Sequence, residues 1–281
     1  MNHKKFYFLI LGLVLSIMVT KAVDPYLDTT LPFETRAKDL VSKMTLTEKI
    51  TQLGHKSSAI TRLGVKAYNY WTEGLHGVAR QGLATSFPQP YGLAATWDST
   101  LIYNIATATS DEARVKNNTN GLGLTYWCPV VNMDRDPRWG REEENFGEDN
   151  FLAGRLAVNF IKGMQGNDPK YLKTVATAKH FACNNVEQGR TSTSSEVDER
   201  SLREYFLPVF KECIQEGKAY SIMSAYNAIN GVPCPANRTL LTNILRNEWG
   251  FKGFVVSDCD AVSDVSVNHK YVPSLTDGTT V

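Results

Sequence analysis

The segment GFVVSDCD (residues 253–260) is a short apolar run that ends abruptly in acidic side chains. Three similar apolar runs come earlier in the chain, at residues 124–131, 174–181 and 219–225. A strand that is covered on both faces needs a continuous apolar run of this kind. The sequence therefore predicts four buried strands, the last of them at residues 253–256.

Helical patterns alternate with these runs. Apolar residues recur at spacings of three and four over residues 32–53, 99–116, 150–164, 199–216 and 240–249. Strands that alternate with helices predict an α/β fold with a parallel sheet. The pattern leaves open whether the sheet is doubly wound or closed into a barrel. No repeat or linker interrupts residues 23–281, so we predict a single domain over that range.

Polar side chains gather where the apolar runs end. Asn132, Asp134 and Arg135 follow the first run, Lys179 and His180 close the second, Tyr226 and Asn227 follow the third, and Asp258 follows the fourth. In barrels, the carboxyl ends of the strands form the rim on which active sites are built. We therefore expect a functional site at this edge of the sheet.

Asp258 is the first candidate for a reacting group. A carboxylate just past a buried strand is held rigidly, which suits a nucleophile that must meet one carbon atom in line. Aspartate is also a common cap of the helix that follows a strand. Position alone favours neither role over the other.

Three further segments contain side chains that could bind a ligand. Lys179 and His180 can donate hydrogen bonds together, although a lone histidine is more often structural. The charged run 134–144 contains arginines suited to multi-donor recognition, although such runs are usually solvated. Residues 70–78 place aromatic rings beside Glu73, as a sugar site requires. The residues alone favour a simpler alternative for this last segment, an aromatic core contact with Glu73 paired to an arginine.

Composition excludes several classes of function. Thirty basic and 29 acidic residues give a net charge of +1, which provides no field to attract nucleic acid or an anionic membrane. The sequence has no pair of histidines at metal-ligand spacing, no dinucleotide fingerprint and no Gly-x-Ser-x-Gly elbow. We predict no metal and no cofactor, a neutral ligand, and hydrolysis by carboxylates.

The first residues predict secretion. Residues 1–5 are basic, residues 6–19 are almost wholly apolar and small residues follow, which is the pattern of a cleaved signal peptide over residues 1–22. A membrane anchor would need about 20 apolar residues. Five cysteines are too few for a disulfide scaffold, and two sequons, at 117–119 and 237–239, are compatible with N-glycosylation on surface loops. We expect the protein outside the cell or in the cell wall.

Five ordered motifs resemble those of glycoside hydrolase family 3. They are WTEGLHGV (71–78), PVVNMDRDPRWGREEENFGED (129–149), AKHFACNN (178–185), MSAYNAINGVP (223–233) and GFVVSDCDAV (253–262). The resemblance covers nearly all of residues 24–270. It implies a (β/α)8 barrel of the TIM type and a retaining mechanism, in which a carboxylate forms a covalent glycosyl-enzyme that water then releases.

The resemblance also implies roles for individual residues. Asp258 matches the nucleophile of the family. Residues that match positions holding or lining the sugar are Glu73, Arg141, Lys179, His180, Met223, Tyr226 and, less closely, Arg138. Glu73 and Cys259 are similar to the branch of β-xylosidases and α-arabinofuranosidases, where many β-glucosidases have Asp and Trp. We expect release of terminal β-xylosyl residues from xylo-oligosaccharides, with β-glucosidase or α-L-arabinofuranosidase activity as the alternatives.

The chain departs from this family after the nucleophile. The family usually completes its barrel and adds a sandwich-like domain that supplies the general acid/base, whereas this sequence ends at Val281 and its last residues, 274–281, do not follow the family pattern. The resemblance therefore predicts a barrel that is incomplete at its C-terminus, with the acid/base and the second domain outside this chain. A sugar-binding or inactive fragment is the alternative of another class.

Overall fold

A computed structural model describes residues 23–278, and the predicted signal peptide lies outside this range. The chain divides into two compact units, one ending at Ile50 and the other beginning at Thr51. The extent of the predicted domain, residues 23–281, stays a prediction. No helix between residues 23 and 278 combines the length and the apolar character that a membrane crossing requires.

The first unit contains the helical turn η1 (Pro25–Leu27) and the helices α1 (Phe33–Lys43) and α2 (Leu46–Ile50). One helix was expected over residues 32–53, and that expectation is wrong at Thr45. The Thr45 hydroxyl accepts from the backbone N–H of Glu48, and the Glu48 carboxylate accepts from the backbone N–H of Thr45. This reciprocal capping starts a second helix and so divides the pattern in two.

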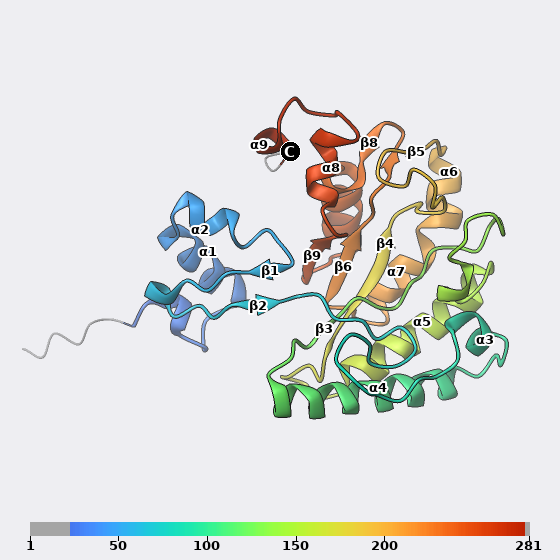
Figure 1. The fold of residues 1–281 in the computed structure, drawn as a ribbon, viewed down its shortest axis with the longest axis horizontal. Coiled ribbons are helices and arrows are strands. Elements are labelled where there is room, and N and C mark those ends of the chain that lie inside the picture. The colour runs from blue at the N-terminus through green and yellow to red at the C-terminus, as the bar shows by residue number, and fades with distance from the viewer. Residues whose placement is uncertain (1–22, 279–281) are drawn as a thin grey trace, which may run out of the picture. The chain divides into compact units, whose positions relative to one another are not determined.

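The second unit is built on a parallel sheet whose strands lie in the order β3 (Thr125–Tyr126), β4 (Val175–Phe181), β6 (Ser221–Ser224) and β9 (Phe254–Ser257). All three pairings are parallel, and a parallel bridge from Thr72 to Tyr126 adds a further segment beside β3. The four predicted strands are confirmed. Figure 1 shows β4, β6 and β9 side by side.

Helices connect and cover these strands, as predicted, and α8 (Ala261–Val267) at their end is a helix that was not predicted. They are α4 (Ser99–Asn120), α5 (Asn150–Gln165), α6 (Glu199–Ser201), the π-helical η4 (Leu202–Phe206), α7 (Pro208–Gln215), the π-helical η6 (Thr239–Glu248) and α8 (Ala261–Val267). Asp98, Asp149 and Asp198 cap α4, α5 and α6 with their carboxylates. The predicted helix 199–216 changes its winding before Pro208, because proline has no N–H for the helical ladder.

Short elements complete the unit. They are β1 (Lys56–Ser57), η2 (Thr61–Leu63), β2 (Tyr68–Asn69), α3 (Pro90–Ala94), η3 (Glu142–Glu144), β5 (Ser194–Ser195), β7 (Ala228–Ile229), β8 (Val232–Pro233), η5 (Cys234–Ala236) and α9 (Leu275–Gly278). The first predicted sequon lies within α4, so the expectation of a loop is wrong there.

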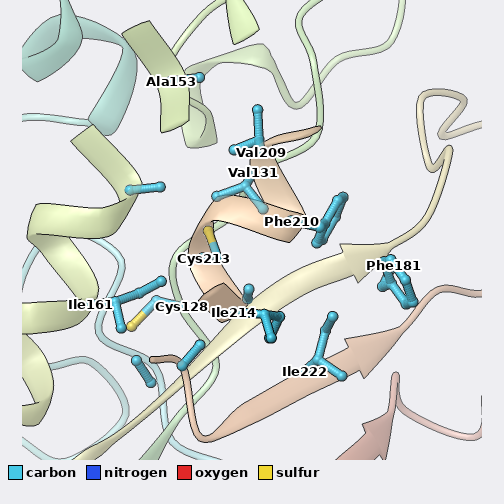
Figure 2. Packing of buried hydrophobic residues seen from close by; sticks show 14 of the residues in the cluster. Cys128, Val131, Ala153, Ile161, Phe181, Val209, Phe210, Cys213, Ile214 and Ile222 are labelled. Carbon is cyan, nitrogen blue, oxygen red and sulfur yellow. The ribbon is translucent and has the colours of Figure 1, made fainter. Parts of the chain in front are cut away.

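The core lies between the sheet and helices α5 and α7 (Figure 2). The ring of Phe181 on β4 lies 5.1 Å from that of Phe210 on α7 and 5.7 Å from that of Trp249. Gly163 lets α5 approach α4, because a Cβ atom there would lie 2.5 Å from the carbonyl oxygen of Tyr103. This packing makes a rigid support for the ends of the strands.

The predicted fold class is confirmed: parallel strands with helices outside them form the wall of a (β/α)8-type barrel. Within residues 23–278 the sheet is an open row of strands with β9 at one edge. The carboxyl ends of β4, β6 and β9 lie together at one edge of this wall. His180, Met223 and Asp258 therefore come from neighbouring strand ends.

Candidate active site

The side chains of Arg141, His180 and Asp258 come from separate segments and lie together, with His180 between the other two. Its Nε2 atom lies 3.7 Å from Oδ2 of Asp258 and 3.4 Å from Nη2 of Arg141. His180 belongs to β4, Asp258 follows β9, and Arg141 lies in the loop after β3. The structure thus brings together three of the predicted site residues, which are up to 117 positions apart in the sequence.

Asp258 continues β9 by one residue. Its backbone N–H donates to the carbonyl of Ser224 at 3.1 Å, and its Oδ1 accepts from the backbone N–H of Cys259 at 2.8 Å. Helix α8 begins later, with Asp260 at its N-cap position. The capping alternative for Asp258 is therefore wrong, since its carboxylate does not accept from the first turn of that helix.

Two opposing effects act on the pKa of the Asp258 carboxyl. It is 9% exposed, and this burial raises the pKa of its carboxyl, while the N–H of Cys259 and the cations Lys179, Arg141 and Arg190 oppose the shift. Burial and the neighbouring Asp258 carboxylate also raise the pKa of the Tyr226 phenol. Tyr226 therefore keeps its proton next to the Asp258 carboxylate.

Asn132 fixes the orientation and the tautomer of His180. Its side-chain oxygen accepts from the backbone N–H of His180 at 2.9 Å and from Nδ1 at 3.0 Å, while its amide nitrogen donates to the His180 carbonyl. Nδ1 must carry the proton, because an amide oxygen only accepts. Burial and the neighbouring arginines and lysine lower the pKa of His180, so the ring is neutral with its Nε2 lone pair facing Arg141.

Lys179 pairs with Glu73. Its Nζ lies 3.3 Å from Oε2 of Glu73, and the other carboxylate oxygen accepts from the indole N–H of Trp71 at 2.8 Å. The expected alternative, Glu73 paired to an arginine, is wrong. Pairing of β4 with β6 is irregular between Ala178 and Phe181, so the usual alternation of faces does not separate Lys179 from His180.

Trp71 is itself held in place. Its ring stacks on Trp127 at 5.5 Å between centroids, and the guanidinium of Arg80 lies 3.9 Å from its centroid. Trp127 is buried, so this contact fixes the indole whose N–H reaches Glu73. The aromatic cluster of residues 70–78 thus combines a core contact with support of a polar group.

Arg141 and Arg138 have different surroundings. Arg141 donates from Nε and Nη2 to both oxygens of Glu144 at 2.8 Å and is half-buried. The side chain of Arg138 is 88% exposed and donates to Asp136, two residues earlier. The structure therefore brings Arg141 into the cluster and does not bring Arg138 there. Met223 lies fully buried on β6, beside Val256 of β9.

Sequence reasoning did not identify Arg190 and Glu144 as parts of this cluster. The guanidinium of Arg190 lies 4.7 Å from the centroid of the Tyr226 ring and pairs with Glu187 at 2.7 Å. Arg190 follows no strand, so the strand-end pattern could not find it. Glu144 lies in the quoted charged run, and its position three residues after Arg141 was the available signal.

A hollow of about 370 Å³ runs along the free edge of β9. Its lining includes Tyr70, Ser224 and Phe254–Ser257, so it reaches the residue before Asp258. Among residues 23–278, no group of three His, Cys, Asp or Glu side chains is arranged to hold a metal ion. All five cysteines are free thiols, and four of them are buried.

The cluster can act through one carboxylate. Glu73 and Glu144 each pair with a cation, whereas no Lys or Arg of the described residues lies within ion-pair distance of Asp258. An unpaired carboxylate keeps its lone pairs available for a bond to carbon. The surrounding N–H groups can donate hydrogen bonds to the hydroxyl oxygens of a neutral ligand.

Comparison with known proteins identifies the family. The profile described as "Glycosyl hydrolase family 3 N terminal domain" matches residues 32–276. The exo-1,4-beta-xylosidase bxlB of Emericella nidulans is 42% identical over 268 residues, which are 89% of this chain and 35% of that protein. The chain thus spans about a third of the length of this relative.

Solved structures agree with this match. The structure described as "GH3 exo-beta-xylosidase (XlnD) in complex with xylobiose aziridine activity based probe" is 35% identical with a TM-score of 0.86, over 92% of this chain and 35% of the other. Beta-glucosidase 3B from Thermotoga neapolitana, in complex with alpha-D-glucose, is 28% identical with a TM-score of 0.72, over 87% and 39%. The family profile and the relatives lead to one conclusion: this chain belongs to glycosyl hydrolase family 3.

Proposed function

We propose that this chain carries the nucleophile and the sugar subsite of a secreted, retaining β-xylosidase that removes terminal, non-reducing β-xylosyl residues. The observation that carries the proposal is Asp258, a buried carboxylate without a cationic partner among cations that are already paired. Relatives described as exo-1,4-beta-xylosidases support the reaction and the substrate. The basic and apolar residues 1–19 support secretion.

In this reaction an Asp258 oxygen attacks the anomeric carbon as the glycosidic C–O bond breaks. A covalent glycosyl-enzyme results, and water then releases the sugar. The leaving oxygen takes its proton from a general acid that we place outside residues 23–278, because Glu73 and Glu144 are each engaged by a cation. Although burial opposes it, the pairing with Arg141 lowers the pKa of Glu144, which keeps it ionised.

The other groups of the cluster bind the sugar. Lys179 and Arg141 supply N–H donors to hydroxyl groups, and neutral His180 supplies a fixed ring beside them. The Tyr226 ring lies next to Asp258 and is backed by Arg190. The cations also stabilise Asp258 as an anion in spite of its burial.

A β-glucosidase is the second candidate, because a β-glucosidase in complex with glucose shares the fold at 28% identity. The two sugars differ by a hydroxymethyl group. Glu73 is held by hydrogen bonds from Lys179 and Trp71, and we infer that the length of its side chain fills the space that a hydroxymethyl group would need. This favours the pentose over the hexose.

Replacing the nucleophile tests the proposed reaction. We expect Asp258→Asn to lower the hydrolysis of 2,4-dinitrophenyl β-xyloside by about a thousandfold or more, since an amide cannot form the covalent intermediate. This leaving group needs no protonation, so release of dinitrophenolate tests the covalent step without a general acid. Asp260→Asn is the matched control, because Asp260 is exposed and asparagine tolerates its positive φ of 62°. Unchanged turnover in Asp258→Asn would reject the assignment.

The same substitution should stabilise the fold at neutral pH. Since the folded pKa of Asp258 is raised, its charge costs stability above that pKa, and the cost disappears as pH falls below the unfolded value. We therefore expect thermal unfolding of Asp258→Asn at a higher temperature than wild type at pH 7, with the difference vanishing near pH 3. Melting curves at the two pH values measure this. A variant less stable than wild type at pH 7 would contradict the electrostatic balance described for Asp258.

Shortening Glu73 tests the choice of sugar. We expect Glu73→Asp to raise the ratio of aryl β-glucoside to β-xyloside turnover roughly tenfold, because one methylene of space is worth about 1–3 kcal/mol. Trp71→Phe is the control. It removes the hydrogen bond to Glu73 but leaves the length of the Glu73 side chain unchanged, so it should affect the turnover of both substrates alike. A ratio that does not change in Glu73→Asp would remove Glu73 from sugar selection.

A further inference from the structure

We infer that Glu144 is a positioning residue, which holds Arg141 in the sugar-binding position and away from Asp258. The inference rests on the proposed function, because it assigns Arg141 to the sugar subsite and Asp258 to the covalent step. Its structural basis is the fork of two hydrogen bonds between Arg141 and Glu144, both 2.8 Å long. A bidentate pair of this kind fixes the plane of a guanidinium as well as its place.

The local chain explains why these two residues meet. Arg141 is the N-cap of the single 3-10 turn η3, whose last residue is Glu144. Residues three apart are eclipsed in such a turn. The turn is held by the Glu144 N–H donating to the Arg141 carbonyl at 3.2 Å, and the buried side chain of Asn145 donates to the same carbonyl at 2.9 Å.

The fork leaves Arg141 with donors to spare. Of its five N–H groups, two serve Glu144 and Nη2 also faces Nε2 of His180 at 3.4 Å. Nη1 makes no hydrogen bond with another of residues 23–278, so its two N–H groups remain for a ligand. Glu144 thus orients the guanidinium so that one side is fixed and the other can bind hydroxyl groups.

Without Glu144 the nearby charges favour a different pairing. Asp258 is the carboxylate of the cluster that lacks a cationic partner, and Arg141 already lies close enough to act on its pKa. A half-buried arginine released from Glu144 is drawn to that anion, because an unpaired charge in a buried site is costly. Such a pair would occupy the lone pairs that the covalent step needs.

The test uses the rate at which 2,4-dinitrophenyl 2-deoxy-2-fluoro-β-xyloside labels the full chain, followed by intact mass. We expect Glu144→Gln to lower the second-order labelling rate about tenfold, the effect of one lost charge-assisted hydrogen bond. The acid limb of the pH profile of the labelling rate should move to lower pH in Glu144→Gln. Without the Glu144 carboxylate to offset its charge, Arg141 lowers the pKa of Asp258. Glu144→Asp keeps the charge and should recover the wild-type limb and part of the rate.

Two controls separate positioning from general stabilisation. Glu143→Gln changes an exposed carboxylate of the same turn and should label like wild type. Arg141→Ala with Glu144→Gln should label no more slowly than Arg141→Ala alone, because Glu144 acts through Arg141. Wild-type labelling in Glu144→Gln, an unmoved acid limb, or additive losses would overturn the inference. If Glu144→Gln fails to fold, Glu144→Ala, which also removes the carboxylate, gives the same comparison. An unlabelled wild type refutes the proposed function itself.

Discussion

Two ion pairs, Lys179 with Glu73 and Arg141 with Glu144, allow charged groups to gather at the half-buried carboxyl end of the sheet. Removing a charge from water costs several kcal/mol unless a partner of opposite sign compensates. In each pair the carboxylate offsets the charge of the cation, which weakens the electric field of the cation at Asp258. The N–H groups that the carboxylate does not use remain available to a ligand. Asp258 is left as the carboxylate without such a partner, and this imbalance is what suits it to covalent chemistry.

The fold provides this arrangement through neighbouring parallel strands. The backbone of Asp258 is tied to β6, and that of His180 to the Asn132 side chain, so the two groups facing each other are fixed independently. The core behind them, with Phe181 against Phe210, leaves little freedom for the strands to shift. Reactive groups on such elements keep their geometry without help from the ligand.

The sequence predicted the strands well, because a buried parallel strand needs a continuous apolar run whatever its neighbours. It predicted the helix break at Thr45 poorly, although Thr45 and Glu48 form a readable capping box. Spacing alone could not distinguish Arg138 from Arg141 in the charged run. Asp136 binds Arg138 locally, whereas Arg141 donates to Glu144 and reaches His180. The family resemblance predicted candidate sugar-binding residues, of which Arg138 does not join the cluster, and only the structure showed Arg190 behind Tyr226.

The most direct measurement is to find which residue becomes covalently bound to the sugar. The chain is incubated with the fluorinated xyloside and digested, and the modified peptide is sequenced by mass spectrometry. The account predicts one sugar per chain, attached to Asp258 through an ester that hydroxylamine cleaves. A sugar attached to Glu73, Glu144 or any other residue would contradict it.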